Sequence, residues 1–192
     1  RRSESDYSID NIQNIQFSTP VNRVVHLLAV YGPELEADLS TGYFLNVTFT
    51  RLCIEFCRRH QIRDVVYIST FQVYGRHSGC LHENSTVSPR NDYALTHYLS
   101  ERIVSDLSDA AGINYLIIRP TNIYGIVENF KRLKNRQSIP FDFVRRAARG
   151  QEIIINHPAI QCNFVGIEDV VRVSQLPCTN QVLNVFGDDT MT

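Results

Sequence analysis

The sequence predicts an α/β fold built on a doubly wound parallel sheet. Three runs, at residues 24–30, 65–69 and 115–118, are almost continuous in apolar and β-branched residues, as strands buried on both faces of a parallel sheet are. Segments with apolar residues at helical spacing separate these runs. Strands that alternate with helices in this way join into a parallel sheet through right-handed crossovers.

The first two helices are predicted from the residues at their ends. Residues 1–22 show little periodicity and predict an irregular lead-in. A loop with Gly32 and Pro33 leads from the first strand to a helix over about 42–60. The next helix begins near Asp92, which can cap it, and ends at Gly112, a residue that favours helix termination.

The last third of the chain predicts shorter elements. Residues 122–139 form a basic loop, for which a solvated surface is the simpler interpretation and a diphosphate contact the alternative. A helix over 141–149, closed by Gly150, follows. Strands at 152–155, 160–166 and 181–186 and a short helix at 168–173 complete the prediction.

Composition argues against several classes of partner. The net charge of -1 gives no strong field toward nucleic acid or an anionic membrane, so we expect neither partner. No stretch approaches the roughly 20 apolar residues that span a bilayer. Five scattered cysteines favour a reducing compartment, so we expect a cytoplasmic protein. Cys53 and Cys57 are expected to be small buried helix residues, and no metal site is predicted.

Hydroxyl residues end the second strand and precede an aromatic pair on a helix. Ser69 and Thr70 stand at the strand end, where open α/β sheets bind their ligands. Tyr93 lies in the first turn of the next helix, and His97 follows four residues later on the same helical face. These side chains are therefore placed to converge on one substrate atom.

Motifs in this region resemble a known family. The run YISTFQVYG at 67–75 is followed by Glu83, Pro89, Tyr93 and Glu101, and then by RPTNIYG at 119–125. In this order they resemble the NAD-dependent epimerase/dehydratase family, the extended short-chain dehydrogenases that modify nucleotide sugars, over about residues 26–187. The resemblance implies an incomplete Rossmann-like dinucleotide-binding domain over 1–137 and part of a substrate-binding region over 138–192.

The resemblance also implies a chemistry. NAD or NADP is the expected cofactor and a nucleotide sugar the expected substrate, with a homodimer formed through the helices near 42–60 and 92–111. Tyr93 would act as general base, Thr70 would bind the same sugar oxygen, and His97 stands where the family has a lysine that binds the nicotinamide ribose. The further implied cofactor contacts are Leu28, Ala29, Asn46 and Pro120, and the further substrate contacts are Asn122 and Cys162.

Four features depart from the family pattern. His97 replaces the lysine, and a histidine with a pKa near ~6.5 is mostly neutral at pH 7. No glycine precedes Gly32, so the Gly-rich turn that receives the pyrophosphate is absent from this chain or from the whole protein. Leu28 replaces a small residue, although a core leucine is the simpler interpretation. Cys162 stands where many members have a phosphate-binding arginine.

The sequence therefore leaves two functions open. The first is an NAD(P)-dependent epimerase or dehydratase of a nucleotide-activated sugar, which the match at Tyr93 and Thr70 favours. The second is a degenerate, non-catalytic member that acts as a nucleotide-binding or protein-interaction module, which the four departures favour.

Overall fold

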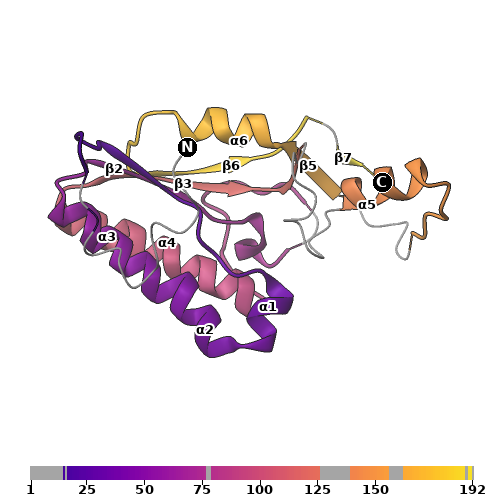
Figure 1. Cartoon of the computed structure of the whole chain (residues 1–192), viewed down its shortest axis with the longest axis horizontal. Coiled ribbons are helices and arrows are strands. Elements are labelled where there is room, and N and C mark those ends of the chain that lie inside the picture. Colours follow the sequence, from indigo (N-terminus) through magenta and orange to yellow (C-terminus); the bar gives the residue numbers. More distant parts are fainter. Residues whose placement is uncertain are drawn as a thin grey trace.

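A four-stranded, wholly parallel sheet forms the centre of the molecule (Figure 1). The computed structural model describes residues 15, 17–76, 79–125, 139–155, 162–188 and 190–191. The strand order is β1-β2-β3-β6. The strands are β1 (Arg23–His26), β2 (Asp64–Ile68), β3 (Asn114–Pro120) and β6 (Gln181–Val185). The predicted parallel sheet is confirmed, although β1 ends at His26 and not at Val30.

Helices cover both faces of this sheet, as the doubly wound prediction requires. One face packs on α3 (Phe49–Arg59) and α4 (Asp92–Ala111), and the other packs on α6 (Ile167–Ser174), which lies above the sheet in Figure 1. Alternate residues of β2 point to opposite faces. Val65 and Tyr67 join the core with α3 and α4, whereas Val66 joins the core with α6.

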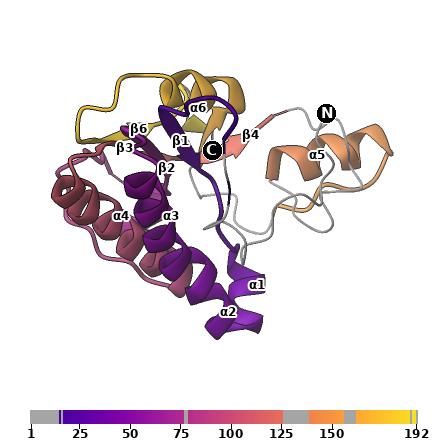
Figure 2. The same ribbon diagram turned by 60° about the vertical axis from the view of Figure 1, so that its left-hand side comes forward.

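The helices begin and end close to the predicted positions. The predicted helix over 42–60 is one helical stretch made of α2 (Leu39–Tyr43), the π-helical turn η2 (Phe44–Thr48) and α3. Figure 2 shows α1 (Gly32–Ala37), which replaces the predicted loop, beside α2 at one end of α3. Gly112 ends α4 with a φ of 66° and confirms the predicted stop.

The predicted cap of α4 is wrong by one residue. The side chain of Asn91 accepts a hydrogen bond of 2.8 Å from the Ala94 amide and caps the helix. Asp92 is the first helical residue, and its carboxylate accepts a hydrogen bond of 2.7 Å from the Tyr43 hydroxyl. Asp92 therefore links α4 to α2 instead of capping α4.

A second, smaller sheet lies beyond the end of the central one (Figure 1). It contains β4 (Asn122–Tyr124), β5 (Cys162–Gly166) and β7 (Thr190–Met191), and β5 pairs parallel with β4 and antiparallel with β7. The helix α5 (Ile139–Ala148) stands beside it. The predicted strand at 152–155 is wrong, because these residues are exposed and pair with no strand in the described part of the chain.

The last predicted strand belongs to the central sheet. We expected β6 within a substrate-binding region over 138–192, but β6 pairs with β3 from Leu116 to Pro120. The expected boundary between residues 137 and 138 lies outside the described residues, as does most of the basic loop over 122–139. The division into two domains therefore stays a prediction.

A buried ion pair joins α4 to the carboxyl ends of three strands. Arg119, at the end of β3, donates hydrogen bonds of 2.9 and 2.6 Å to the two carboxylate oxygens of Glu101 on α4. The two side chains are 5% and 4% exposed. Ser69, just after β2, donates to the same carboxylate. Arg119 also donates a 2.8 Å hydrogen bond to the Tyr74 hydroxyl, which donates one of 2.8 Å to Asn184 on β6.

We expect this ion pair to be the most sensitive polar contact in the fold. Arg119→Met leaves the Glu101 carboxylate buried without its cation and should lower the free energy of unfolding by about 3–5 kcal/mol. Urea denaturation measures the loss. Arg102→Met is the matched control, because the neighbouring Arg102–Asp106 pair is exposed and should contribute at most about 0.5 kcal/mol.

The double variant Glu101→Leu/Arg119→Met tests the cause of the loss. Two apolar residues of similar volume remove the unpaired charge and should recover much of the stability. Equal stability of Arg119→Met and Arg102→Met would show that the buried pair has no special role.

Candidate functional site

Most of the predicted site residues gather at the carboxyl ends of β1, β2 and β3, beside the first turns of α4. Thr70 follows β2 after Ser69, and Tyr93 is the second residue of α4. The side chain of Thr70 lies close enough to that of Tyr93 to lower the pKa of the tyrosine. The structure thus brings together two hydroxyls from segments more than 20 positions apart, as the spacing along the chain predicts.

The turn after β2 fixes the position of Thr70. Its hydroxyl accepts a hydrogen bond of 3.3 Å from the Gln72 amide and caps the 3-10 turn η3 (Phe71–Tyr74). Gly75 closes this turn with a φ of 62°, and a side chain there would collide with the carbonyl oxygen of Ser88. Thr70 is 6% exposed, so its side chain has little freedom to move.

Tyr93 is held in its neutral form. Burial and, after it, the negative charge that Tyr31 could carry raise the pKa of Tyr93 to about 12, against the opposing effect of Thr70 as a hydrogen-bond partner. Near neutral pH the hydroxyl of Tyr93 therefore keeps its proton and acts as a hydrogen-bond donor.

His97 is a buried, neutral side chain. It is 2% exposed, its Nδ1 lies 2.8 Å from the hydroxyl of Tyr67, and its ring centroid lies 4.6 Å from that of Tyr93. Burial lowers the pKa of His97 to about 4. His97 therefore carries no positive charge near pH 7 that could stabilise a Tyr93 phenolate. Its Nε2 is buried without a hydrogen-bond partner among the described residues.

A second buried histidine lies on the other side of Tyr67. The ring centroids of His26 and Tyr67 are 5.3 Å apart, and His26 Nε2 lies 2.9 Å from the hydroxyl of Thr50. Burial lowers the pKa of His26 to about 4 and raises the pKa of Tyr67 above its ordinary value. The sequence predicted no role for Tyr67 or His26, because strand residues on β1 and β2 carry no local sign that their rings meet.

Asn46 is a positioning residue in this structure. Its side chain accepts a hydrogen bond of 2.6 Å from the Val30 amide and donates bonds of 3.3 Å to the Val30 carbonyl and 3.0 Å to the Thr96 hydroxyl. Asn46 is 1% exposed. It therefore holds the segment after β1 against α4, in place of pointing into open space.

The other expected cofactor contacts surround the strand ends. Leu28 and Ala29 follow β1, and Pro120 is the buried last residue of β3. Leu28 is 36% exposed, so the interpretation as a core leucine is wrong. β1 ends at His26, and the chain after it leaves the sheet, which takes this leucine out of the core.

The expected substrate contacts lie in the smaller sheet. Asn122 begins β4, two residues beyond Pro120, and donates a hydrogen bond of 3.0 Å to the Asn163 carbonyl of β5. Cys162 is the half-buried first residue of β5 and a free thiol. The structure thus places both residues past the end of β3, and their contact with a substrate stays a prediction.

Two general features of the described residues bear on function. No three His, Cys, Asp or Glu side chains among them gather closely enough to hold a metal ion. Within the same part of the chain, no helix has the length and apolar character needed to cross a bilayer.

The two buried histidines should make stability depend on pH. Their pKa falls from 6.5 to about 4 on folding, so between these values the unfolded chain binds protons that the folded chain does not. The free energy of unfolding should therefore fall as pH drops from ~6.5 to ~4, by up to about 3 kcal/mol for each histidine, and should be unaffected by them at higher pH.

Denaturation in urea from pH 4.5 to 7.5 measures this dependence. His26→Asn and His97→Asn should each flatten the curve, whereas His82→Asn, at an exposed position, should leave it unchanged. Parallel curves for the wild type and both core variants would contradict the assignment of neutral buried histidines.

Comparison with known proteins identifies relatives of this chain. The family model "NAD dependent epimerase/dehydratase family" matches residues 6–184. An uncharacterised UDP-glucose epimerase of Bacillus subtilis is 25% identical over 160 residues, which are 74% of this chain and 51% of that protein. The chain thus spans about half the length of this curated relative.

Solved structures share the fold. UDP-glucose 4-epimerase from Thermotoga maritima, solved with UDP-glucose, gives a TM-score of 0.83 at 18% identity and covers 95% of this chain and 61% of its own. UDP-glucuronic acid 4-epimerase from Bacillus cereus was solved with UDP-glucuronic acid and NAD. It gives a TM-score of 0.77 at 19% identity, and the match covers 100% of this chain and 60% of that protein's chain. Because the family model matches most of its length, this chain belongs to the NAD-dependent epimerase/dehydratase family.

Proposed function

We propose that the protein is an NAD(P)-dependent epimerase or dehydratase of a nucleotide-activated sugar, with Tyr93 as general base and Thr70 binding the same sugar oxygen. The observation that carries the proposal is that Thr70, just after β2, lies beside Tyr93 in the first turn of α4, close enough to lower its pKa. The nucleotide sugars named for the related structures support the substrate class. Family membership supports the nicotinamide cofactor.

The proposed chemistry begins with the oxidation of a sugar carbinol. Tyr93, as phenolate, takes the proton of the sugar hydroxyl, and Thr70 holds the same oxygen by a hydrogen bond. NAD or NADP, when bound, supplies the acceptor for the hydride. Because Thr70 is nearly buried and fixed by its turn, it can define where the sugar oxygen lies.

The residues present fit one part of this cofactor. Leu28 is accessible beside the end of β1, and with Ala29 it offers an apolar surface suited to a nicotinamide ring. His97 does not fit the ribose contact, because the ring nitrogen that has no partner among the described residues, Nε2, is fully buried. Asn46 would act indirectly by holding the segment that contains Leu28 and Ala29.

The state of Tyr93 sets the pH at which such an enzyme works. With a pKa of about 12, only ~10⁻⁵ of the hydroxyl is ionised at pH 7. In the family a lysine supplies the charge that lowers this pKa, and the neutral His97 does not. We therefore expect weak activity at neutral pH that increases in alkaline solution.

His97→Lys tests this mechanism. In the wild type, turnover of UDP-glucose should rise by about tenfold for each pH unit between pH 7 and 10, because the phenolate fraction does. In His97→Lys the ammonium group beside Tyr93 should lower its pKa and shift the profile down by at least about one unit. His97→Gln, which adds no charge, is the matched control, and Tyr93→Phe should abolish turnover. A pH-independent rate would contradict the role of Tyr93 as base.

The neutral His97 also favours a second candidate. A degenerate member would bind a nucleotide sugar without converting it, because Tyr93 would remain a hydrogen-bond donor. Calorimetric binding of UDP-glucose, without turnover at any pH in the wild type or in His97→Lys, would decide for this function.

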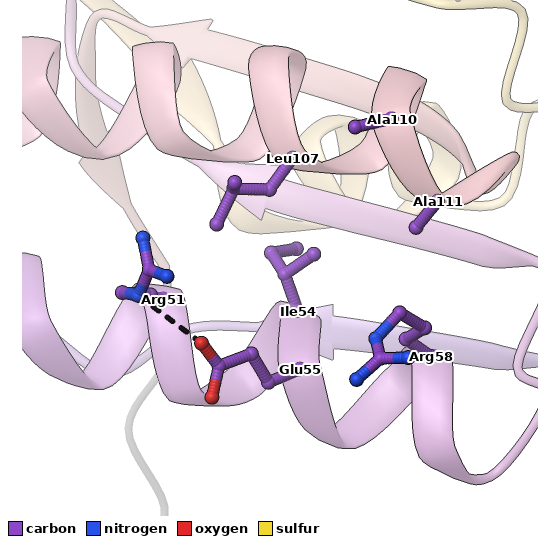
Figure 3. A pocket seen from close by; sticks show the side chains of 7 residues that line it. All are labelled: Arg51, Ile54, Glu55, Arg58, Leu107, Ala110 and Ala111. Atoms are coloured by element: carbon purple, nitrogen blue, oxygen red, sulfur yellow. Dashed lines mark ion pairs between the residues drawn. The ribbon is translucent and has the colours of Figure 1, made fainter.

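We also propose that the protein forms a homodimer through α3 and α4. A groove of about 260 Å³ lies between these helices. Figure 3 shows Ile54 and Leu107 pointing toward each other across it. An ion pair of 3.1 Å between Arg51 and Glu55 lies at its side. Apolar and charged groups of both signs on one face suit a two-fold contact, in which each surface meets itself.

Sedimentation at micromolar concentration should give twice the chain mass of 22.0 kDa. Ala110→Arg, in the groove, should give a monomer because the arginine obstructs the contact. Ala148→Arg is the control, since it places the same side chain on the exposed part of α5. A monomeric wild type would contradict the proposed homodimer.

The expected location in the cytoplasm stays a prediction, in keeping with five free thiols.

A further inference from the structure

An exposed tyrosine stands beside the proposed base. Tyr31, which follows β1, is 51% exposed. Its ring meets the ring of Tyr93 edge to face, with centroids 5.7 Å apart and planes at 72°. This is a favourable arrangement for two aromatic rings, so the contact orients Tyr31 over Tyr93.

The backbone around Tyr31 is fixed although its side chain is free on one side. Val30, the preceding residue, is held by hydrogen bonds of 2.6 and 3.3 Å with the side chain of Asn46. The carbonyl of Tyr31 accepts a 2.9 Å hydrogen bond from the amide of Leu35, which is fully buried in α1. A side chain mounted on such rigid supports keeps its direction when a ligand arrives.

The hydroxyl end of Tyr93 lies within the electrostatic reach of Tyr31. The charge that Tyr31 could carry is the second cause of the raised pKa of Tyr93, after burial. The edge-to-face contact places the ring of Tyr31 against Tyr93, the residue at which the sugar oxygen would bind. A large ring with an open face at this place borders any sugar that reaches Tyr93.

We propose that Tyr31 is a specificity-determining residue that covers Tyr93 and forms one wall of the sugar-binding site. Its ring packs on the apolar face of the hexose, and its hydroxyl reaches toward the solvent. The sugar contact rests on the proposed function, whereas the cover over Tyr93 does not. The segment after β1 thus contributes to the substrate site as well as to the expected cofactor site.

Chemical modification tests, without any ligand, whether Tyr31 covers Tyr93. Tetranitromethane modifies exposed tyrosines, and mass spectrometry of peptides measures the rate at Tyr93. Tyr31→Ala should raise that rate several-fold because it removes the covering ring, whereas Tyr31→Phe should retain the protection. Tyr124→Ala, at a tyrosine that is 48% exposed on β4, is the control and should not change the rate.

Calorimetric titration with UDP-glucose and with UDP tests whether Tyr31 forms a wall of the sugar-binding site. Tyr31→Ala should weaken the binding of UDP-glucose by about tenfold and leave the binding of UDP unchanged, because only the sugar meets this ring. Tyr31→Phe should stay within about threefold of the wild type, since it keeps the ring.

The outcomes separate this inference from the proposed function. If the wild type binds UDP-glucose and Tyr31→Ala changes neither its affinity nor the modification of Tyr93, the role of Tyr31 is refuted and the proposed function stands. If the wild type binds no nucleotide sugar, the proposed function and the sugar wall both fail. The modification rates would then still decide whether Tyr31 covers Tyr93.

Discussion

The buried ion pair between Arg119 and Glu101 is the contact on which the geometry of the site depends. Two charges with almost no exposure are stable only when paired and hydrogen-bonded in one arrangement, so this pair fixes α4 against the ends of β2 and β3. Tyr93 lies eight residues before Glu101 on the same helix, about two turns away. Ser69, which donates to Glu101, is next to Thr70. The ion pair thereby fixes the two segments that carry the proposed base and its hydroxyl partner.

The fold was predictable because parallel strands buried on both faces consist of nearly continuous apolar and β-branched residues. β2 and β3 follow the predicted runs closely, and Gly112 ends α4 where expected. The run at 152–155 has the same composition, yet Ile154 is 60% exposed and the segment forms no strand. A strand requires a neighbour to pair with, and the neighbour is a property of the whole fold. The same limit explains β6, whose place in the central sheet depends on pairing with a strand distant in the sequence.

The site was predictable only where the spacing of residues along the sequence determines which side chains lie together. The spacing from Thr70, just after a strand, to Tyr93, in the first turn of the next helix, could be read from the chain, and the two side chains do lie close together. The environment of His97 could not, because Tyr67 contacts it from β2, and His26 packs against Tyr67 from β1. Charge follows burial, so the protonation of a histidine cannot be deduced from its position in a motif. The sequence placed His97 correctly on the helix and left its charge open.

The π-helical turn over Phe44–Thr48 changes the direction in which the side chains of the following helix α3 point, relative to those of the turn. Such a turn accommodates one residue more than an α-helix of the same length, and turns of this kind often occur at functional sites. Downstream, α3 keeps its apolar face toward the sheet, while Asn46, within the turn itself, faces Val30. Without the additional residue the two could not be in phase, since each residue rotates an α-helix by about 100°. The length of this turn is therefore as much a part of the site as the side chains that it carries.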